Sequence, residues 1–380
     1  MKIVINIASL NGGALIREQN ILCALSDIDH ENEYIILCHK YQVSKISFIF
    51  GSNFHLYPVK MLPGFWGRFL WENINLPLIV KNIYPDVLLF PLHMTNFYDV
   101  CKKVIVIRNA APFYDNIIQN SNLYQRFRLL TIRLGTWISI RRANYVIFIS
   151  ETTRTRVYEK LRLNNIASKV VKHGLPRGFS PKSSEESAPV LKRYGIKKPY
   201  LLSVGLIARY KNLRELIEAY ILAQDTTRQI PPLYIVGFVY EEDYFEDIQK
   251  IICKKGINEK VHFIGTVVHE DLPYLYSNCE LFIFTSACEN SPLVLIEAMA
   301  CGAAILTSNQ SFAKEMCGDV PIYFNPFYPR DIARTIMLGL SDKKIRETLS
   351  KKAVARASYF SWIKAAKEMK EVFESVVHSG

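Results

Sequence analysis

The sequence predicts an α/β protein with two domains, each built on a parallel sheet. Short apolar runs, such as residues 3–7, alternate with stretches of helical periodicity, which is the pattern of strands joined by helices. The chain has 380 residues, enough for two hydrophobic cores. A second series of strands and helices begins at residues 200–204. It follows a polar segment rich in Pro and Ser, residues 180–189, that we interpret as a linker.

The composition indicates a globular protein with an anionic partner. Hydrophobic residues make up 49% of the chain and charged residues 22%, values that exclude a disordered chain. The net charge of +12 favours a nucleotide, an acidic membrane surface or a nucleic acid as partner, although an excess of solvated lysines gives the same charge. The sequence has no C-x-x-C pair and no apolar run long enough to span a bilayer. We therefore expect no zinc site, no transmembrane helix, and a cytoplasmic protein with free thiols.

The N-terminal half contains a candidate phosphate-binding loop. The predicted first strand, residues 3–7, is followed by a loop with Gly12 and Gly13 and then by a helix to about residue 25. This loop has no G-x-G-x-x-G pattern, so a tight turn explains its two glycines equally well. Further strands are predicted at residues 33–38, 86–90, 104–107 and 145–150.

An arginine-rich helix is predicted at residues 123–142. Apolar side chains recur along it at helical spacing, at Tyr124, Phe127, Leu130 and Leu134. The same segment carries Arg126, Arg128, Arg133, Arg141 and Arg142. A basic amphipathic helix of this kind suits an anionic membrane or a phosphorylated lipid acceptor. A solvated, charged helix face is the alternative interpretation.

Lys211 is the candidate anion-binding residue of the second half. It follows the strand at residues 200–204 and precedes a helix that Asn212 and Glu215 would cap. An ammonium group beside a helix N-terminus can hold a diphosphate. The alternative is a cationic, solvated turn.

Two glutamates flank the start of another predicted helix. A buried strand rich in Phe and Ile precedes Glu289, and Glu297 lies on the helix, about 10 Å away along its axis. Ser291 is predicted to cap this helix and Pro292 to fill its first position, so that the amides from Leu293 onward face an anion. Each carboxylate matches a vicinal diol, and the layout fits a nucleotide-sugar. A capped core helix with both glutamates facing solvent is the alternative.

Glu289 and Glu297, with seven residues between them and Ala-Met-Ala-Cys-Gly after them, resemble the E-x7-E signature of family 4 glycosyltransferases. The resemblance implies the GT-B fold, in which two Rossmann-like domains face a cleft, and transfer with retention of configuration. It also implies that Glu289 contacts the donor sugar and Glu297 the nucleotide ribose. Arg209 and Lys211 would stabilise the departing diphosphate.

Other positions also resemble this family. Gly12 and Gly13 stand where the N-terminal domain approaches the donor phosphates, and Gly265 ends a strand whose loop flanks the base. Arg108 stands where members often carry His. A permanent cation there suits an acceptor phosphate or the charge of a leaving group, and a structural Arg–carboxylate pair is the alternative.

The resemblance also predicts the domain boundaries and the reaction. Residues 1–176 would form the acceptor domain, residues 177–358 the nucleotide-sugar domain, and residues 359–380 a helix that crosses back to the first domain. We expect a sugar to pass from a nucleoside-diphosphate sugar to a saccharide acceptor linked to polyprenyl diphosphate, in bacterial surface polysaccharide assembly. The reaction would take place at the inner face of the membrane, without a cofactor, metal ion or nucleic acid. The alternatives are a GT-B epimerase or hydrolase, and a non-catalytic basic module that binds membranes or nucleic acid.

Overall fold

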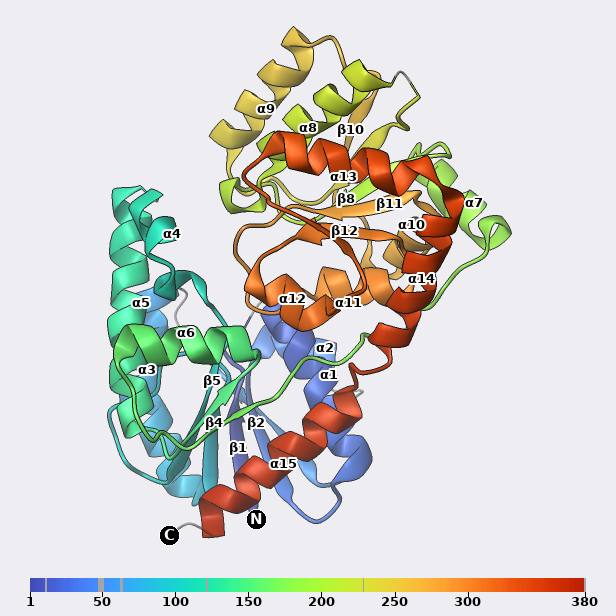
Figure 1. Ribbon diagram of the computed structural model, residues 1–380. Helices are drawn as coiled ribbons and strands as arrows, with labels where there is room; N and C mark the ends of the chain where they lie inside the picture. The colour runs from blue at the N-terminus through green and yellow to red at the C-terminus, as the bar shows by residue number, and fades with distance from the viewer. Residues whose placement is uncertain (11, 47–50, 62–63, 121, 228, 379–380) are drawn as a thin grey trace. The chain divides into compact units, whose positions relative to one another are not determined.

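A computed structural model describes residues 1–10, 12–46, 51–61, 64–120, 122–227 and 229–378. The chain divides into two compact units. Unit 1 comprises Met1–Gly174 together with Ser361–Gly380, and unit 2 comprises Leu175–Phe360. Figure 1 shows that each unit is a sheet with helices on both faces.

Unit 1 contains a seven-stranded sheet in the order β3-β2-β1-β4-β5-β6-β7, and its neighbouring strands pair in parallel. Its strands are β1 (Lys2–Asn6), β2 (Glu33–His39), β3 (Phe54–Val59), β4 (Val87–Phe90), β5 (Lys102–Ile107), β6 (Tyr145–Phe148) and β7 (Ser168–Val170). Its helices are α1 (Gly12–Ile28), α2 (Val43–Ile46), α3 (Gly64–Ile83), α4 (Asp115–Asn120), α5 (Leu123–Arg142), α6 (Glu151–Leu161) and α15 (Trp362–His378). Because helices cover both faces, the central strands are almost entirely buried.

The C-terminal helix α15 belongs to the core of unit 1. Its side chains Met369 and Phe373 are buried, and the helix packs on α1. Trp362, at its start, stacks on the buried His173 with the ring centroids 5.8 Å apart. A Cβ at Gly174 would lie only 2.2 Å from the backbone nitrogen of Trp362, so the chain can pass this close only with glycine at that position.

Unit 2 contains a six-stranded sheet in the order β10-β9-β8-β11-β12-β13, again with parallel pairs. Its strands are β8 (Leu201–Val204), β9 (Leu233–Val236), β10 (Val261–Gly265), β11 (Leu281–Phe284), β12 (Ile305–Ser308) and β13 (Ile322–Phe324). Its helices are α7 (Ser184–Arg193), α8 (Leu213–Thr226), α9 (Glu242–Lys254), α10 (Leu272–Asn278), α11 (Leu293–Ala300), α12 (Ser311–Cys317), α13 (Pro329–Ser341) and α14 (Lys343–Ala357). The strand order reverses between β8 and β11, the point at which open α/β sheets bind ligands beyond the carboxyl ends of their strands.

The interpretation of residues 180–189 as a linker is wrong. Helix α7 begins within this segment, and Ser183 and Glu186 form a capping box at its start. The Ser183 hydroxyl accepts from the Glu186 amide at 3.2 Å, and the Glu186 carboxylate accepts from the Ser183 amide at 2.8 Å. These two hydrogen bonds satisfy helix-start amides, which outweighs the unfavourable Pro and Ser content.

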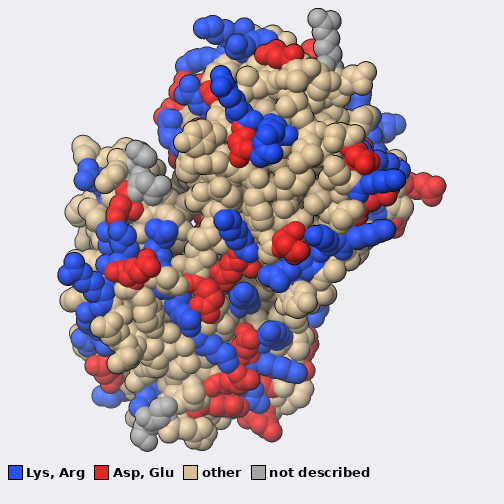
Figure 2. Space-filling model, viewed as in Figure 1, with Lys and Arg blue, Asp and Glu red and all other residues tan. Residues whose placement is uncertain are grey.

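Helix hydrophobicity and surface charge are relevant to the expectation of a membrane or another anionic partner. Among the described residues, no helix is both long and apolar enough to cross a bilayer. Figure 2 shows Lys and Arg side chains interspersed with Asp and Glu over the face that it draws. The net charge alone therefore does not locate an anionic partner on this face.

Candidate active site

A lysine and a glutamate meet at the carboxyl ends of β8 and β11. Lys211 lies in a short 3₁₀ turn, Arg209–Lys211, after β8, and Glu289 lies in the loop after β11. The Lys211 ammonium donates to Glu289 Oε1 at 2.5 Å, and the Ser286 hydroxyl donates to the same oxygen at 2.9 Å. Both charged side chains are mostly buried, with 12% and 18% of their surface exposed. The first glutamate of the motif and the predicted lysine thus form one site.

The loops that contain Lys211 and Glu289 are joined by hydrogen bonds. The Thr285 hydroxyl donates to the Lys211 carbonyl at 2.7 Å, and the Ala287 amide donates to the Tyr210 carbonyl at 2.8 Å. A small depression beside the pair is lined by Gly205, Lys211, Thr285 and neighbouring residues. The ammonium group is therefore held in place at the edge of an open surface.

Glu297 is buried in the core side of α11. Only 3% of its surface is exposed, and its carboxylate accepts from Tyr276 Oη at 3.2 Å and lies 3.0 Å from His269 Nε2. The hydrogen bond to Glu297 raises the pKa of His269, against the opposing effect of burial. The alternative in which both glutamates face solvent is therefore wrong for Glu297. Nothing in the sequence marks His269 or Tyr276, since neither belongs to a motif.

Helix α11 begins later than predicted. Leu293 is its first residue, and Pro292 occupies the N-cap position without a side-chain cap. Ser291 is not the cap, because its hydroxyl points to the Met316 sulfur at 3.8 Å. The predicted Ser291 cap and the Pro292 first position are both wrong. Pro292 is extended (ψ 109°), the usual conformation of a residue just before a helix.

The predicted cap of α8 is also wrong, and Arg209 is already paired. Asn212 adopts a left-handed conformation (φ 52°) and its side-chain amide donates to the Pro326 carbonyl at 3.1 Å, so it does not cap α8. The Arg209 guanidinium forms an ion pair with Asp243 and lies 3.3 Å from Glu241. Arg209 therefore has acidic partners of its own at the start of α9.

Three glycines bring neighbouring loops into backbone contact. A Cβ at Gly237 would lie 1.8 Å from the Gly205 carbonyl oxygen, a distance that excludes any larger residue. The Gly237 amide donates to the Gly265 carbonyl at 2.9 Å. Gly265 ends β10 with φ 76°, and a Cβ there would meet nothing within 4 Å. These glycines keep the strand ends close to the Lys211 site.

In unit 1, Gly12 and Gly13 form the first turn of α1, beside Arg108 (Asn11 lies outside the described residues). The Arg108 guanidinium donates to the Ala14 carbonyl at 3.2 Å and lies 3.3 Å from Glu18 Oε1. Burial lowers the pKa of Arg108 to about 10, so it remains charged at neutral pH. The structure thus contains the Arg–carboxylate pair that the sequence left open as an alternative.

The comparisons identify the family. Residues 190–356 match the model of the group 1 glycosyl transferases. The chain is 31% identical over 261 residues to O-antigen chain mannosyltransferase B of Escherichia coli, and this match covers 67% of each chain. It is 31% identical over 184 residues, or 47% of each chain, to the N-acetylgalactosamine-N,N'-diacetylbacillosaminyl-diphospho-undecaprenol 4-alpha-N-acetylgalactosaminyltransferase of Campylobacter jejuni. A third match, to the much longer serotype-specific mannosyltransferase WbdA of Escherichia coli, is 30% identical over 244 residues and covers 63% of this chain but only 29% of WbdA.

Solved structures agree on the architecture. Anabaena HepE, crystallised with UDP and glucose, superposes with a TM-score of 0.74 over 99% of this chain and 100% of its own, at 19% identity. Two parallel-sheet units with a charged site at the strand ends define a GT-B glycosyltransferase. The chain belongs to the group 1 glycosyl transferases, in agreement with the family 4 resemblance.

Proposed function

We propose that this glycosyltransferase moves a sugar from a nucleoside-diphosphate sugar to a lipid-linked saccharide during assembly of a bacterial surface polysaccharide, with retention. The observation that carries the proposal is the Lys211–Glu289 pair at the strand ends of unit 2, with Glu297 on the adjoining helix. The relatives named for O-antigen mannosyl transfer and for a diphospho-undecaprenol acceptor support this substrate class.

In the proposed reaction the donor's diphosphate lies against Lys211 and the start of α11. The ammonium offsets the charge that builds on the leaving diphosphate, and its fixed position means that little reorganisation is needed. Once the phosphate shares the ammonium, Glu289 accepts from a hydroxyl of the donor sugar. Glu297 has acceptor capacity left beside His269 and Tyr276, which it offers to the ribose. Because Lys211 and the N-terminus of α11 supply the positive charge beside the diphosphate, we propose that no divalent cation is needed.

The other predicted donor contacts have secondary roles in this proposal. Gly12 and Gly13, in the first turn of α1, are proposed to let a donor phosphate approach the backbone. Arg108 steadies that turn through the Ala14 carbonyl and adds positive charge. Gly265 lets the base lie against the end of β10, and Arg209 reaches the diphosphate only if it leaves Asp243.

The acceptor is proposed to bind in a cavity of about 620 Å³ in unit 1. The cavity lies beyond the carboxyl ends of the strands and contains Arg68, His93, Asn109 and Arg128. Burial lowers the pKa of His93 to about 3, so it is a neutral hydrogen-bonding group there. The two arginines suit a diphosphate, and the neutral side chains suit saccharide hydroxyls.

Calorimetry with UDP-, GDP- and dTDP-sugars tests the donor, and NMR of the product's anomeric proton tests retention. We expect one nucleotide class to bind, transfer to a diphosphate-linked saccharide, an unchanged anomeric configuration, and full activity in EDTA. Release of free sugar without an acceptor would instead indicate a hydrolase. Absence of binding by every nucleotide-sugar to the folded protein would refute the proposal.

A further inference from the structure

Large apolar side chains point outward from two neighbouring helices of unit 1. On α3, Trp66 is 70% exposed and Leu70 49%, and on α5, Tyr124 is 77% exposed and Phe127 72%. The apolar stripe that the sequence places on α5 therefore faces solvent. Exposed apolar surface of this extent usually marks a site of interaction with a protein or a membrane.

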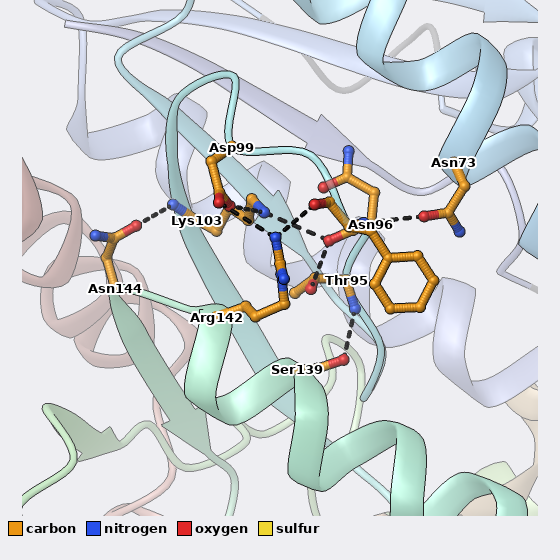
Figure 3. A network of polar contacts seen from close by, with 9 residues as sticks. Asn73, Thr95, Asn96, Asp99, Lys103, Ser139, Arg142 and Asn144 are labelled. Carbon is orange, nitrogen blue, oxygen red and sulfur yellow. Dashed lines mark hydrogen bonds and ion pairs between the residues drawn. The ribbon is translucent and has the colours of Figure 1, made fainter.

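The loop between β4 and β5 joins the two helices into one surface. Its residue Phe97 is exposed. Figure 3 shows Asn73 of α3 and Ser139 and Arg142 of α5 pointing toward this loop. The Phe97 amide donates to Asn73 of α3 at 2.9 Å, and Arg142 of α5 donates to the Phe97 carbonyl at 2.5 Å. The Ser139 hydroxyl of α5 accepts from the Thr95 amide at 3.0 Å. We call the outward side of α3, α5 and this loop the α3–α5 face.

A lysine of the sheet also holds the loop between β4 and β5. Lys103 of β5 is almost fully buried and donates to Asp99 at 2.6 Å, and Asp99 also pairs with Arg142 at 3.2 Å. The aromatic residue of the loop is thus presented by a rigid frame, so little ordering entropy is lost when this face binds a partner.

The charge of the α3–α5 face is positive. Helix α5 contains five arginines and no acidic residue. Two of them have acidic partners, since Arg133 pairs with Asp115 and Arg142 with Asp99. Within the described part of the chain, Arg126 and Arg128 form no ion pair and are exposed, and Arg141 packs over the Trp137 ring at 3.8 Å.

This face borders the proposed acceptor cavity. Gly64 and Arg68 of α3 and Arg128 and Ile132 of α5 line both the cavity and the inner edge of the face. A carrier lipid lying in a bilayer presents its phosphates at the level of the headgroups. A face resting on that bilayer would therefore hold the cavity at the same depth as the phosphates.

We propose that the α3–α5 face docks on an anionic lipid bilayer. The proposal rests on the proposed function for its purpose, and on the exposed aromatic residues and unpaired arginines for its chemistry. Aromatic and leucine side chains beside arginines on one helix face match the interface of a bilayer, where apolar groups enter the acyl boundary and cations meet lipid phosphates. A protein partner would need acidic residues to complement α5, and it is an outcome that the test separates.

Co-sedimentation with vesicles tests the proposal on the full chain. We expect binding to vesicles of phosphatidylglycerol and phosphatidylcholine to exceed binding to phosphatidylcholine alone, and to weaken with added salt. The double variant Arg126→Gln, Arg141→Gln should bind the anionic vesicles about thirtyfold more weakly, because each basic residue near such a surface contributes about fivefold. Its matched control, Lys254→Gln, Lys255→Gln on the exposed end of α9, removes the same charge from unit 2 and should bind like the wild type.

A second pair of variants tests the apolar contribution. Phe127→Ser with Leu134→Ser should lower vesicle binding on the order of tenfold or more, whereas Leu222→Ser with Leu338→Ser, exposed on α8 and α13, should not. All four variants should keep nucleotide-sugar affinity and turnover of a water-soluble acceptor, which separates failed docking from a failed function. Equal binding to neutral and anionic vesicles, or a dimer in sedimentation that the apolar variants dissociate, would overturn the proposal.

Discussion

Lys211 can act on the reaction only if its charge is used more in the transition state than in the bound donor. We expect Lys211→Ala to lower kcat on the order of a hundredfold, the cost of removing one preorganised stabilising group, while donor affinity changes by only a few-fold. Steady-state kinetics and calorimetry with the donor check this, with Lys254→Ala as the control. If KM rises and kcat does not change, Lys211 merely anchors the ground state.

Glu297 is proposed to bind the ribose, and its existing hydrogen bonds allow that role to be tested separately from a structural one. We expect Glu297→Ala to weaken nucleotide binding on the order of tenfold or more, since a hydrogen bond to a charged group contributes about 1.5–3 kcal/mol. Tyr276→Phe removes only the internal hydrogen bond, so it should lower stability by about 1 kcal/mol and leave nucleotide affinity intact. Unchanged UDP and GDP affinity in folded Glu297→Ala excludes the ribose contact.

His269 makes the stability of unit 2 depend on pH. Its hydrogen bond to Glu297 raises its pKa, so the folded state holds the proton more tightly than the unfolded state. The stabilisation is therefore fully present below the ordinary value of 6.5 and is lost as the pH rises through the raised pKa. Urea unfolding of wild type and His269→Gln should differ most at acidic pH and converge at alkaline pH. His30→Gln, exposed in unit 1, serves as the control, and a pH-independent difference for His269→Gln contradicts the assignment.

For single residues, the sequence predicted that Lys211, Glu289 and Glu297 belong to one donor site, but it did not predict the side chains that they contact. The Lys211–Glu289 ion pair joins residues 78 positions apart, and no local pattern encodes that approach. The partners His269 and Tyr276 come from a separate turn and helix, so only the folded sheet brings them to Glu297.

Among the elements, β8, β9 and β10 depend on glycines at their carboxyl ends. We expect Gly237→Ala to destabilise the protein by about 1–3 kcal/mol or more, because the new Cβ would lie 1.8 Å from the Gly205 oxygen and the backbone has to move. Gly256→Ala also has a positive φ but opens onto free space, so its cost should be about 1 kcal/mol. Urea unfolding measures both costs, and equal values would mean that the contact at Gly237 relaxes without strain.

The sequence predicted most strands but missed β3, β7 and β13, and it also missed helix α3. Strand β3 lies at the edge of the sheet, so its side chains are partly exposed and it contains Pro58, which removes the continuous apolar run typical of the central strands. Helix α3 contains Pro77, which argues against a helix from sequence alone. The C-terminal helix predicted within residues 359–380 is confirmed as α15 (Trp362–His378), whose apolar stripe is regular and uninterrupted.

For the whole molecule, α15 is expected to control the stability of unit 1. Phe373 is completely buried, and Phe373→Ala should cost about 3–5 kcal/mol. Hydrogen–deuterium exchange should show faster exchange in α1 and β1 while peptides of unit 2 keep their protection. Lys367 is exposed on the same helix, so Lys367→Ala should not change the hydrogen exchange of either unit. Uniform loss of protection in both units would show that they unfold as one body.

The position of α15 in unit 1 affects how the protein is made. Unit 2 is one continuous stretch, Leu175–Phe360, and can fold once it has left the ribosome. The main part of unit 1 precedes unit 2 in the chain, yet the helix that covers α1 follows unit 2 and is synthesised after it. At typical translation rates, about 10–40 s separate the two parts of unit 1. During that interval the side of α1 that α15 covers is exposed, so unit 1 is completed only after unit 2 and depends on chaperones for longer.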